Sequence, residues 1–128
     1  MAAQESIKLL TLKKNTQMIL LDAVLKTIRR DNLLAETLAT GAVLLGGLQD
    51  LESRFPGLLN SARGRGTFCA INCDSGARRD AILEKLRELG VHAGGCGEAA
   101  IRLRPALVFG QAHANLFLSK FEDVLKSF

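Results

Sequence analysis

The sequence contains no tryptophan and no tyrosine, and it has only two prolines and two histidines among 128 residues. A hydrophobic core must therefore rest on aliphatic side chains and on six phenylalanines. No stretch of about 18 apolar residues is present, so the sequence predicts no membrane-spanning helix and no membrane partner. The net charge is only +4. Because the basic residues are spread along the chain and interleaved with acids, we expect solvated helix faces and no nucleic-acid partner.

Common catalytic and metal-binding patterns are missing as well. Cys69, Cys73 and Cys96 show no CxxC spacing, so we expect small, partly buried thiols in a reducing compartment rather than a zinc site or a redox pair. His92 and His113 are isolated, and no serine or cysteine lies in a nucleophile-elbow context. The dinucleotide and P-loop fingerprints are absent. The residues therefore predict no catalytic, cofactor-binding or metal-binding residue in this chain.

Hydrophobic periodicity and turn residues predict the secondary structure. Helices are expected over 17–30, from 32 to 54 or 55, after a cap at Asp74 or Ser75 as far as Gly90, and over 112–126. Strands are expected over 67–71, 91–93 and 101–104, with a tight loop at 94–97. This order predicts an α+β fold, in which helices cover one face of a small, mostly antiparallel sheet.

The same periodicity predicts which helical side chains are buried. For the second helix these are Leu34, Leu38, Leu45, Leu48 and Phe55. For the third they are Ile82, Leu83, Leu86 and Leu89, and for the last Leu116, Phe117, Phe121, Val124, Leu125 and Phe128. Glycines at 41, 46 and 47 weaken the second helix, and we expect close packing of another element there.

The residues with the clearest chemical potential are Arg102 and Arg104. Strand alternation places both on one face, with Ile101 and Leu103 on the other. A guanidinium group can bind a carboxylate through two parallel hydrogen bonds and hold an acidic substrate in one orientation. The spacing alone favours two surface or ion-paired arginines on a half-exposed sheet.

The segment Arg63–Gly66 is a second basic motif. Its arginines and glycine amides could bind an anion, or the motif could contact RNA in the manner of RGG tracts. Because it leads directly into the strand formers of 67–71, we favour a tight turn that opens a buried strand.

Several ordered blocks together resemble a known family, the class III pyridoxal-phosphate-dependent aminotransferases, and in particular their eukaryotic 4-aminobutyrate type. The blocks are Met18–Val24 with Ile28–Leu34, Arg63–Cys69, Gly94–Gly97, Ile101–Pro105 with Leu107–Phe109, and His113–Phe121. The resemblance implies that 1–14 is an unmatched segment, that 15–31 is a linking helix, and that 32–128 is the C-terminal small domain of a fold-type I enzyme.

The resemblance also implies a role for one residue. The family arginine at the position of Arg102 binds the carboxylate of the amino-acid or keto-acid substrate, whereas Arg104 and Arg63–Gly66 look structural. In the family the cofactor is pyridoxal phosphate, held through a lysine in a large domain that lies upstream of the matched region. We therefore expect this chain to hold no cofactor and to be inactive alone. A free-standing binding or interaction module derived from the domain is the alternative.

Family analogy further implies homodimers and the mitochondrial matrix, with the cytoplasm as the other possibility. Met1–Gln17 shows no clear targeting signal, because it lacks both a secretory apolar core and any arginine.

Overall fold

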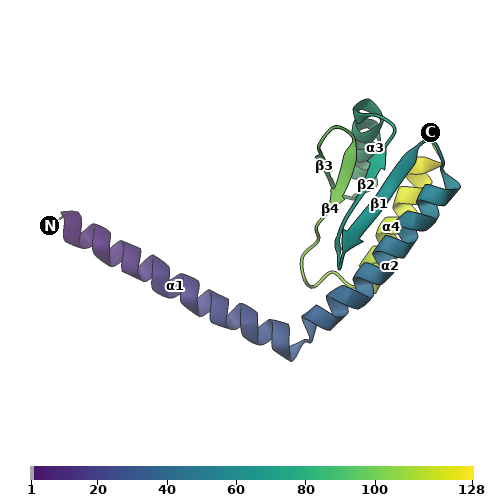
Figure 1. Ribbon diagram of the computed structural model, residues 1–128. Coiled ribbons are helices and arrows are strands. Elements are labelled where there is room, and N and C mark those ends of the chain that lie inside the picture. Colours follow the sequence, from purple (N-terminus) through teal and green to yellow (C-terminus); the bar gives the residue numbers. More distant parts are fainter. Residues whose placement is uncertain (1) are drawn as a thin grey trace. The chain divides into compact units, whose positions relative to one another are not determined.

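The computed structural model describes residues 2–128 and confirms the α+β fold (Figure 1). Its elements are α1 (Ala2–Arg30), α2 (Leu33–Arg54), β1 (Leu59–Arg65), β2 (Phe68–Cys73), α3 (Gly76–Glu88), β3 (Gly94–Cys96), β4 (Ala100–Leu103) and α4 (Gln111–Leu125). By its contacts the chain divides into a first unit that ends at Leu34 and a second unit, Ala35–Phe128.

The second unit is a four-stranded antiparallel sheet, in the order β1-β2-β4-β3, with helices on one face. The strands alternate as expected: Cys69, Ile71 and Cys73 of β2 are buried, and so are Ile101 and Leu103 of β4. They form one core with side chains from α2, α3 and α4, among them Leu48, Leu86 and Phe121. The opposite sheet face carries the exposed Phe68 and the half-buried Ala70, Asn72 and Arg102.

Local chemistry sets the ends of α3, as the sequence predicted. The side chain of Ser75 accepts a hydrogen bond from the backbone N–H of Arg78 at 3.2 Å, which satisfies one free donor of the first turn. Gly90 follows the helix with φ +81°, a conformation that costs a residue without a side chain very little.

Two strands differ from the prediction because their pairing is set by distant residues. A tight turn was expected at Arg63–Gly66; the turn into β2 does include Gly66 (φ 56°), but Arg63 and the residues before it belong to β1, which pairs with β2 through Arg63 and Ala70. An irregularity near Ser61 (φ 57°) interrupts the ladder, and there the carboxylate of Glu52 accepts the backbone N–H groups of Ser61 and Ala62 at 2.8 and 3.0 Å. β3 forms at 94–96, not at 91–93, because β4 supplies its hydrogen-bonding partners.

Some helical burial was also predicted wrongly. The buried stripe of α2 runs through Leu44, Leu48 and Leu51. Because apolar residues occupy almost every side of α2, the hydrophobic periodicity did not identify which side is buried. Five side chains expected in the core are exposed in the structure: Leu34, Leu38, Leu89, Leu116 and Phe128.

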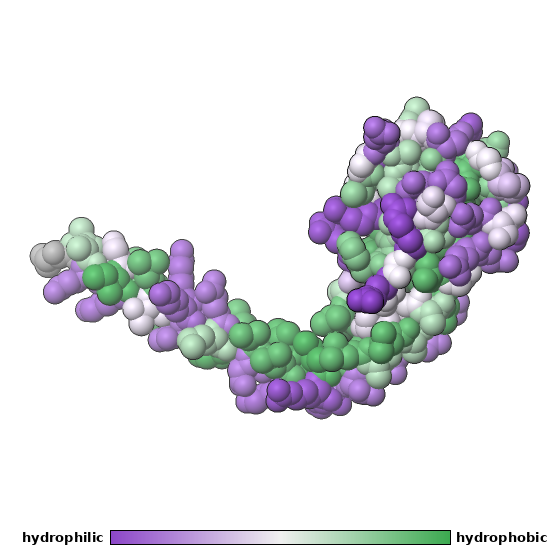
Figure 2. Space-filling model, viewed as in Figure 1, coloured by the Kyte–Doolittle hydropathy of each residue, from purple (hydrophilic) through white to green (hydrophobic). Residues whose placement is uncertain are grey.

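The first unit is dominated by α1, which begins at Ala2 rather than at Gln17. Residues 2–16 contain alanine, leucine, lysine and glutamine and no glycine or proline, so they extend the helix even without a regular apolar stripe. No residue of α1 is buried. Figure 2 shows apolar side chains gathered along its C-terminal half, where Leu20, Leu21 and Val24 are 50–60% exposed.

Candidate functional site

Arg102 lies in the middle of the sheet. Its backbone pairs with Ala70 of β2 on one side and with Gly94 of β3 on the other. Ile101 and Leu103, its neighbours in β4, are 0% and 9% exposed and point into the core. The side chain of Arg102 must therefore leave the sheet on the face opposite the helices, and it is half-buried there.

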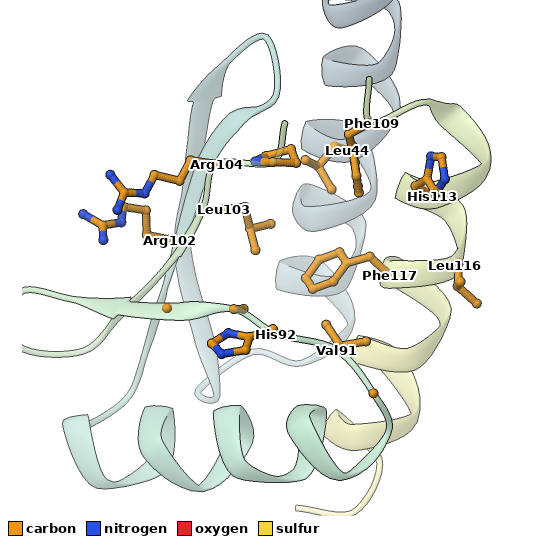
Figure 3. A pocket seen from close by; sticks show the side chains of 14 residues that line it. Leu44, Val91, His92, Arg102, Leu103, Arg104, Phe109, His113, Leu116 and Phe117 are labelled. Atoms are coloured by element: carbon orange, nitrogen blue, oxygen red, sulfur yellow. The ribbon is translucent and has the colours of Figure 1, made fainter. Parts of the chain in front are cut away.

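A cavity of about 470 Å³ lies beside this strand. Its lining includes Leu44, His92, Phe109 and Phe117, together with the segment 102–105. In Figure 3 the side chain of Leu103 points toward Leu44 and Phe117, whereas the side chains of Arg102 and Arg104 point together in the opposite direction. The cavity therefore has a mainly apolar interior on the core side of β4. The guanidinium groups of Arg102 and Arg104 lie on the opposite side of this strand.

The register of the sheet adds a third arginine to this face. Arg63 of β1 pairs with Ala70, which pairs in turn with Arg102, so both arginines belong to one row across the sheet. The guanidinium of Arg63 donates to the backbone carbonyl of Ser61 at 2.8 Å and to Oδ1 of Asn72 at 3.0 Å. The sequence did not bring Arg63 and Arg102 together, because it predicted no strand at 59–65.

Arg102 and Arg104 have no acidic partner within the described part of the chain: none of the ion pairs among residues 2–128 involves either of them. The described residues thus show no internal ion pair at either arginine, and the two interpretations left open are plain surface residues and a carboxylate site. A half-buried guanidinium with free N–H groups can donate two parallel hydrogen bonds to an external carboxylate.

His113 and two of the cysteines lie in structural positions. Nδ1 of His113 accepts the backbone N–H of Gly110 at 3.0 Å, and its ring stacks on Phe109. Cys69 and Cys73 are buried, and burial raises the pKa of both thiols, that of Cys73 to about 11. Cys96 is exposed.

Two kinds of site are not found among residues 2–128. No cluster of His, Cys, Asp and Glu within this range could hold a metal ion. None of the helices in the same range has the length and apolar character that a membrane span requires.

Comparison with known proteins identifies the family. The family described as Aminotransferase class-III matches residues 14–125. The chain belongs to the class III aminotransferases. Among curated class III relatives, mitochondrial 4-aminobutyrate aminotransferase of Sus scrofa is 44% identical over 110 residues, which are 86% of this chain and 22% of that protein. The Dictyostelium discoideum 4-aminobutyrate aminotransferase is 43% identical over 106 residues, 83% of this chain and 21% of that protein.

Solved structures agree with this class III assignment. A lysine aminotransferase from M. tuberculosis superposes with a TM-score of 0.78 at 26% identity, over 81% of this chain and 24% of that one. An Arthrobacter phospholyase superposes with a TM-score of 0.76 at 31% identity, over 83% and 27%. The chain thus spans about a fifth to a quarter of the length of its relatives.

Class III membership implies pyridoxal phosphate in the intact enzyme. This cofactor needs a lysine that reaches it within a pocket. No lysine lines the cavity beside Arg102. Lys13 and Lys14 are exposed on α1, where no residue is buried. Residues 2–128 therefore do not fit a complete pyridoxal-phosphate site.

Proposed function

We propose that the chain serves as the small domain of a 4-aminobutyrate-type aminotransferase, and that Arg102 binds the substrate carboxylate. In the intact enzyme the reaction would transfer the amino group of 4-aminobutyrate to 2-oxoglutarate. Three curated relatives with this name, from pig, Dictyostelium and human, are 43–44% identical to the chain. By analogy with the pig and human proteins, whose names include "mitochondrial", we infer the same compartment.

The observation that supports the role of Arg102 is its free guanidinium on the uncovered sheet face. Backbone pairing on both sides fixes the position of its Cα, and none of the ion pairs in residues 2–128 occupies its donors. A fixed arginine of this kind binds and orients a carboxylate, and it needs no proton transfer because a guanidinium stays charged at neutral pH.

Arg102→Ala tests this role. We expect the Nε–Hε resonance of Arg102 to shift in an NMR titration of the chain with 2-oxoglutarate or glutamate, with a Kd on the order of 1 mM, since two charge-assisted hydrogen bonds contribute about 3–6 kcal/mol together. Arg102→Ala should weaken binding about tenfold or more, because the bidentate contact is lost. Arg104→Ala is the matched control, since it removes an equal charge from the same face.

Equal losses for the two variants would indicate general attraction to a basic surface and would contradict a specific site at Arg102. An absence of any carboxylate binding would favour the second candidate, a free-standing interaction module with this fold. The exposed apolar side chains of α1 are the observation behind that candidate.

A further inference from the structure

Arg79 of α3 is held in an unusual environment for a surface helix residue. Its side chain is only 14% exposed, and its Nε contacts Oδ1 of Asp80 at 2.6 Å. Its Nη1 points at the β3–β4 connection and lies 3.4–3.5 Å from three backbone carbonyl oxygens, those of Cys96, Gly97 and Ala100. One guanidinium thus faces three main-chain dipoles of the same hairpin.

Two glycines make this approach possible. A Cβ on Gly95 of β3 would lie 2.9–3.1 Å from Nη1, Cζ and Cδ of Arg79, so the guanidinium would have to shift to make room for it. A Cβ on Gly76, in the first turn of α3, would lie 2.7 Å from the carbonyl oxygen of Glu98 in the hairpin turn. The first turn of α3 therefore contacts the hairpin turn at Gly76, and the side chain of Arg79 packs against Gly95.

The hairpin that Arg79 contacts is the one that carries Arg102. Ala100, whose carbonyl faces Nη1, begins β4 and precedes Arg102 by two residues, and Gly94 of β3 is the direct strand partner of Arg102. β3 spans only three residues and contains two glycines, so the ladder alone restrains it weakly. A contact from α3 is an additional restraint on the edge of the sheet next to the carboxylate site.

We propose that Arg79 is a positioning residue for Arg102, which fixes the β3–β4 hairpin against α3 so that the Arg102 guanidinium meets a carboxylate in one orientation. This inference rests on the proposed carboxylate role of Arg102. A lysine at this position would keep the charge but would lose the Nε contact to Asp80 and the planar group that lies against Gly95.

The test compares Arg79→Met with Arg78→Met. Arg78 is the neighbouring arginine on α3, pairs with Asp74 at 3.5 Å and lies over the ring of Phe128, away from the hairpin. Without any ligand, Arg79→Met should speed amide hydrogen exchange at 95–102 by about tenfold and shift the Arg102 Nε–Hε resonance, with β1 and α4 unchanged.

Three further variants serve as comparisons. With Arg79→Lys, exchange at 95–102 should be slower than with Arg79→Met but still faster than in the parent chain. Arg78→Met should change neither the exchange nor the Arg102 resonance. Gly95→Ala, which displaces the guanidinium, should reproduce the Arg79→Met result.

With ligand, Arg79→Met should also weaken 2-oxoglutarate binding at least threefold. If the parent chain binds no carboxylate, the proposed function fails, while the ligand-free measurements still decide whether Arg79 holds the hairpin. Faster exchange spread evenly over the whole second unit would overturn the positioning role and leave Arg79 a general source of stability.

Discussion

At the scale of single residues, the clearest constraint is the contact between Gly41 of α2 and the turn at Gly66. A Cβ on Gly41 would lie 2.3 Å from the carbonyl carbon and oxygen of Gly66, and backbone atoms there cannot move aside as a side chain could. Gly46, on the same helix, has no such neighbour within 4 Å. The two glycines are chemically identical in the sequence and differ only in what packs against them.

Gly41→Ala should lower the free energy of unfolding by about 1–3 kcal/mol, because the overlap outweighs the better helix propensity of alanine. Gly46→Ala should raise it by about 0.5–1 kcal/mol, since only the propensity changes. Urea unfolding followed by circular dichroism measures both values. A Gly41→Ala variant as stable as the Gly46→Ala variant would show that α2 does not approach the Gly66 turn this closely.

The sequence allowed part of the site to be predicted at this scale. Strand alternation placed Arg102 opposite Ile101 and Leu103, since that pattern depends only on adjacent residues. It could not place Arg63 in the same row, nor Arg79 against the hairpin, because register and helix docking depend on residues distant in the chain.

At the scale of elements, α2 and α4 are joined by a charged contact. Arg54 of α2 pairs with Glu122 of α4, and Lys126 reaches the same carboxylate at 2.8 Å. The hydrogen bond from Arg54, followed by that from Lys126, lowers the pKa of Glu122 from its ordinary value of 4.5 to about 2. The carboxylate therefore stays charged in the folded chain at pH values where it would be protonated in the unfolded one.

The sign of this shift gives a pH prediction. Because the folded pKa is the lower one, Glu122 stabilises the fold fully above about pH 4.5, and that contribution is lost as the pH falls toward about 2. Glu122→Gln should therefore be less stable than the parent near pH 6, and the difference should shrink on acidification. Thermal unfolding from pH 6 to pH 2 measures it, with Asp123→Asn as the control at a neighbouring exposed acid. A constant difference across this range would refute the assignment.

Elements whose ends are set by local chemistry were predicted best. Ser75 and Gly90 mark the two ends of α3 because a cap and a left-handed residue act within a few positions. β1 and β3 could not be predicted in this way. The arginines and glycine of β1 and the glycines of β3 do not favour strands. β1 is stabilised by pairing with β2 and by the carboxylate of Glu52, and β3 is stabilised by pairing with β4.

At the scale of the whole molecule, the feature that calls for an explanation is α1. None of the residues of this helix is buried. Between Met18 and Ile28 one face of the helix is apolar, and on it Leu21 is 57% and Leu25 43% exposed. Leu21, Leu25 and Ile28 recur at helical spacing, whereas Asp22 and Lys26 form an ion pair on another side. An apolar stripe of this length is unfavourable in water and favours association with another surface.

We expect the purified chain to self-associate through this stripe, with a weight-average mass that rises with concentration in sedimentation or light scattering. The double substitution Leu21→Glu and Leu25→Glu should shift the chain to a monomer, since it places charge within the apolar stripe. Thr16→Glu with Ala23→Glu adds the same charge on the polar side of α1 and should leave association unchanged. Equal dissociation by both pairs would assign the effect to net charge, and a parent chain that remains monomeric at all concentrations would show that the stripe of α1 does not drive self-association.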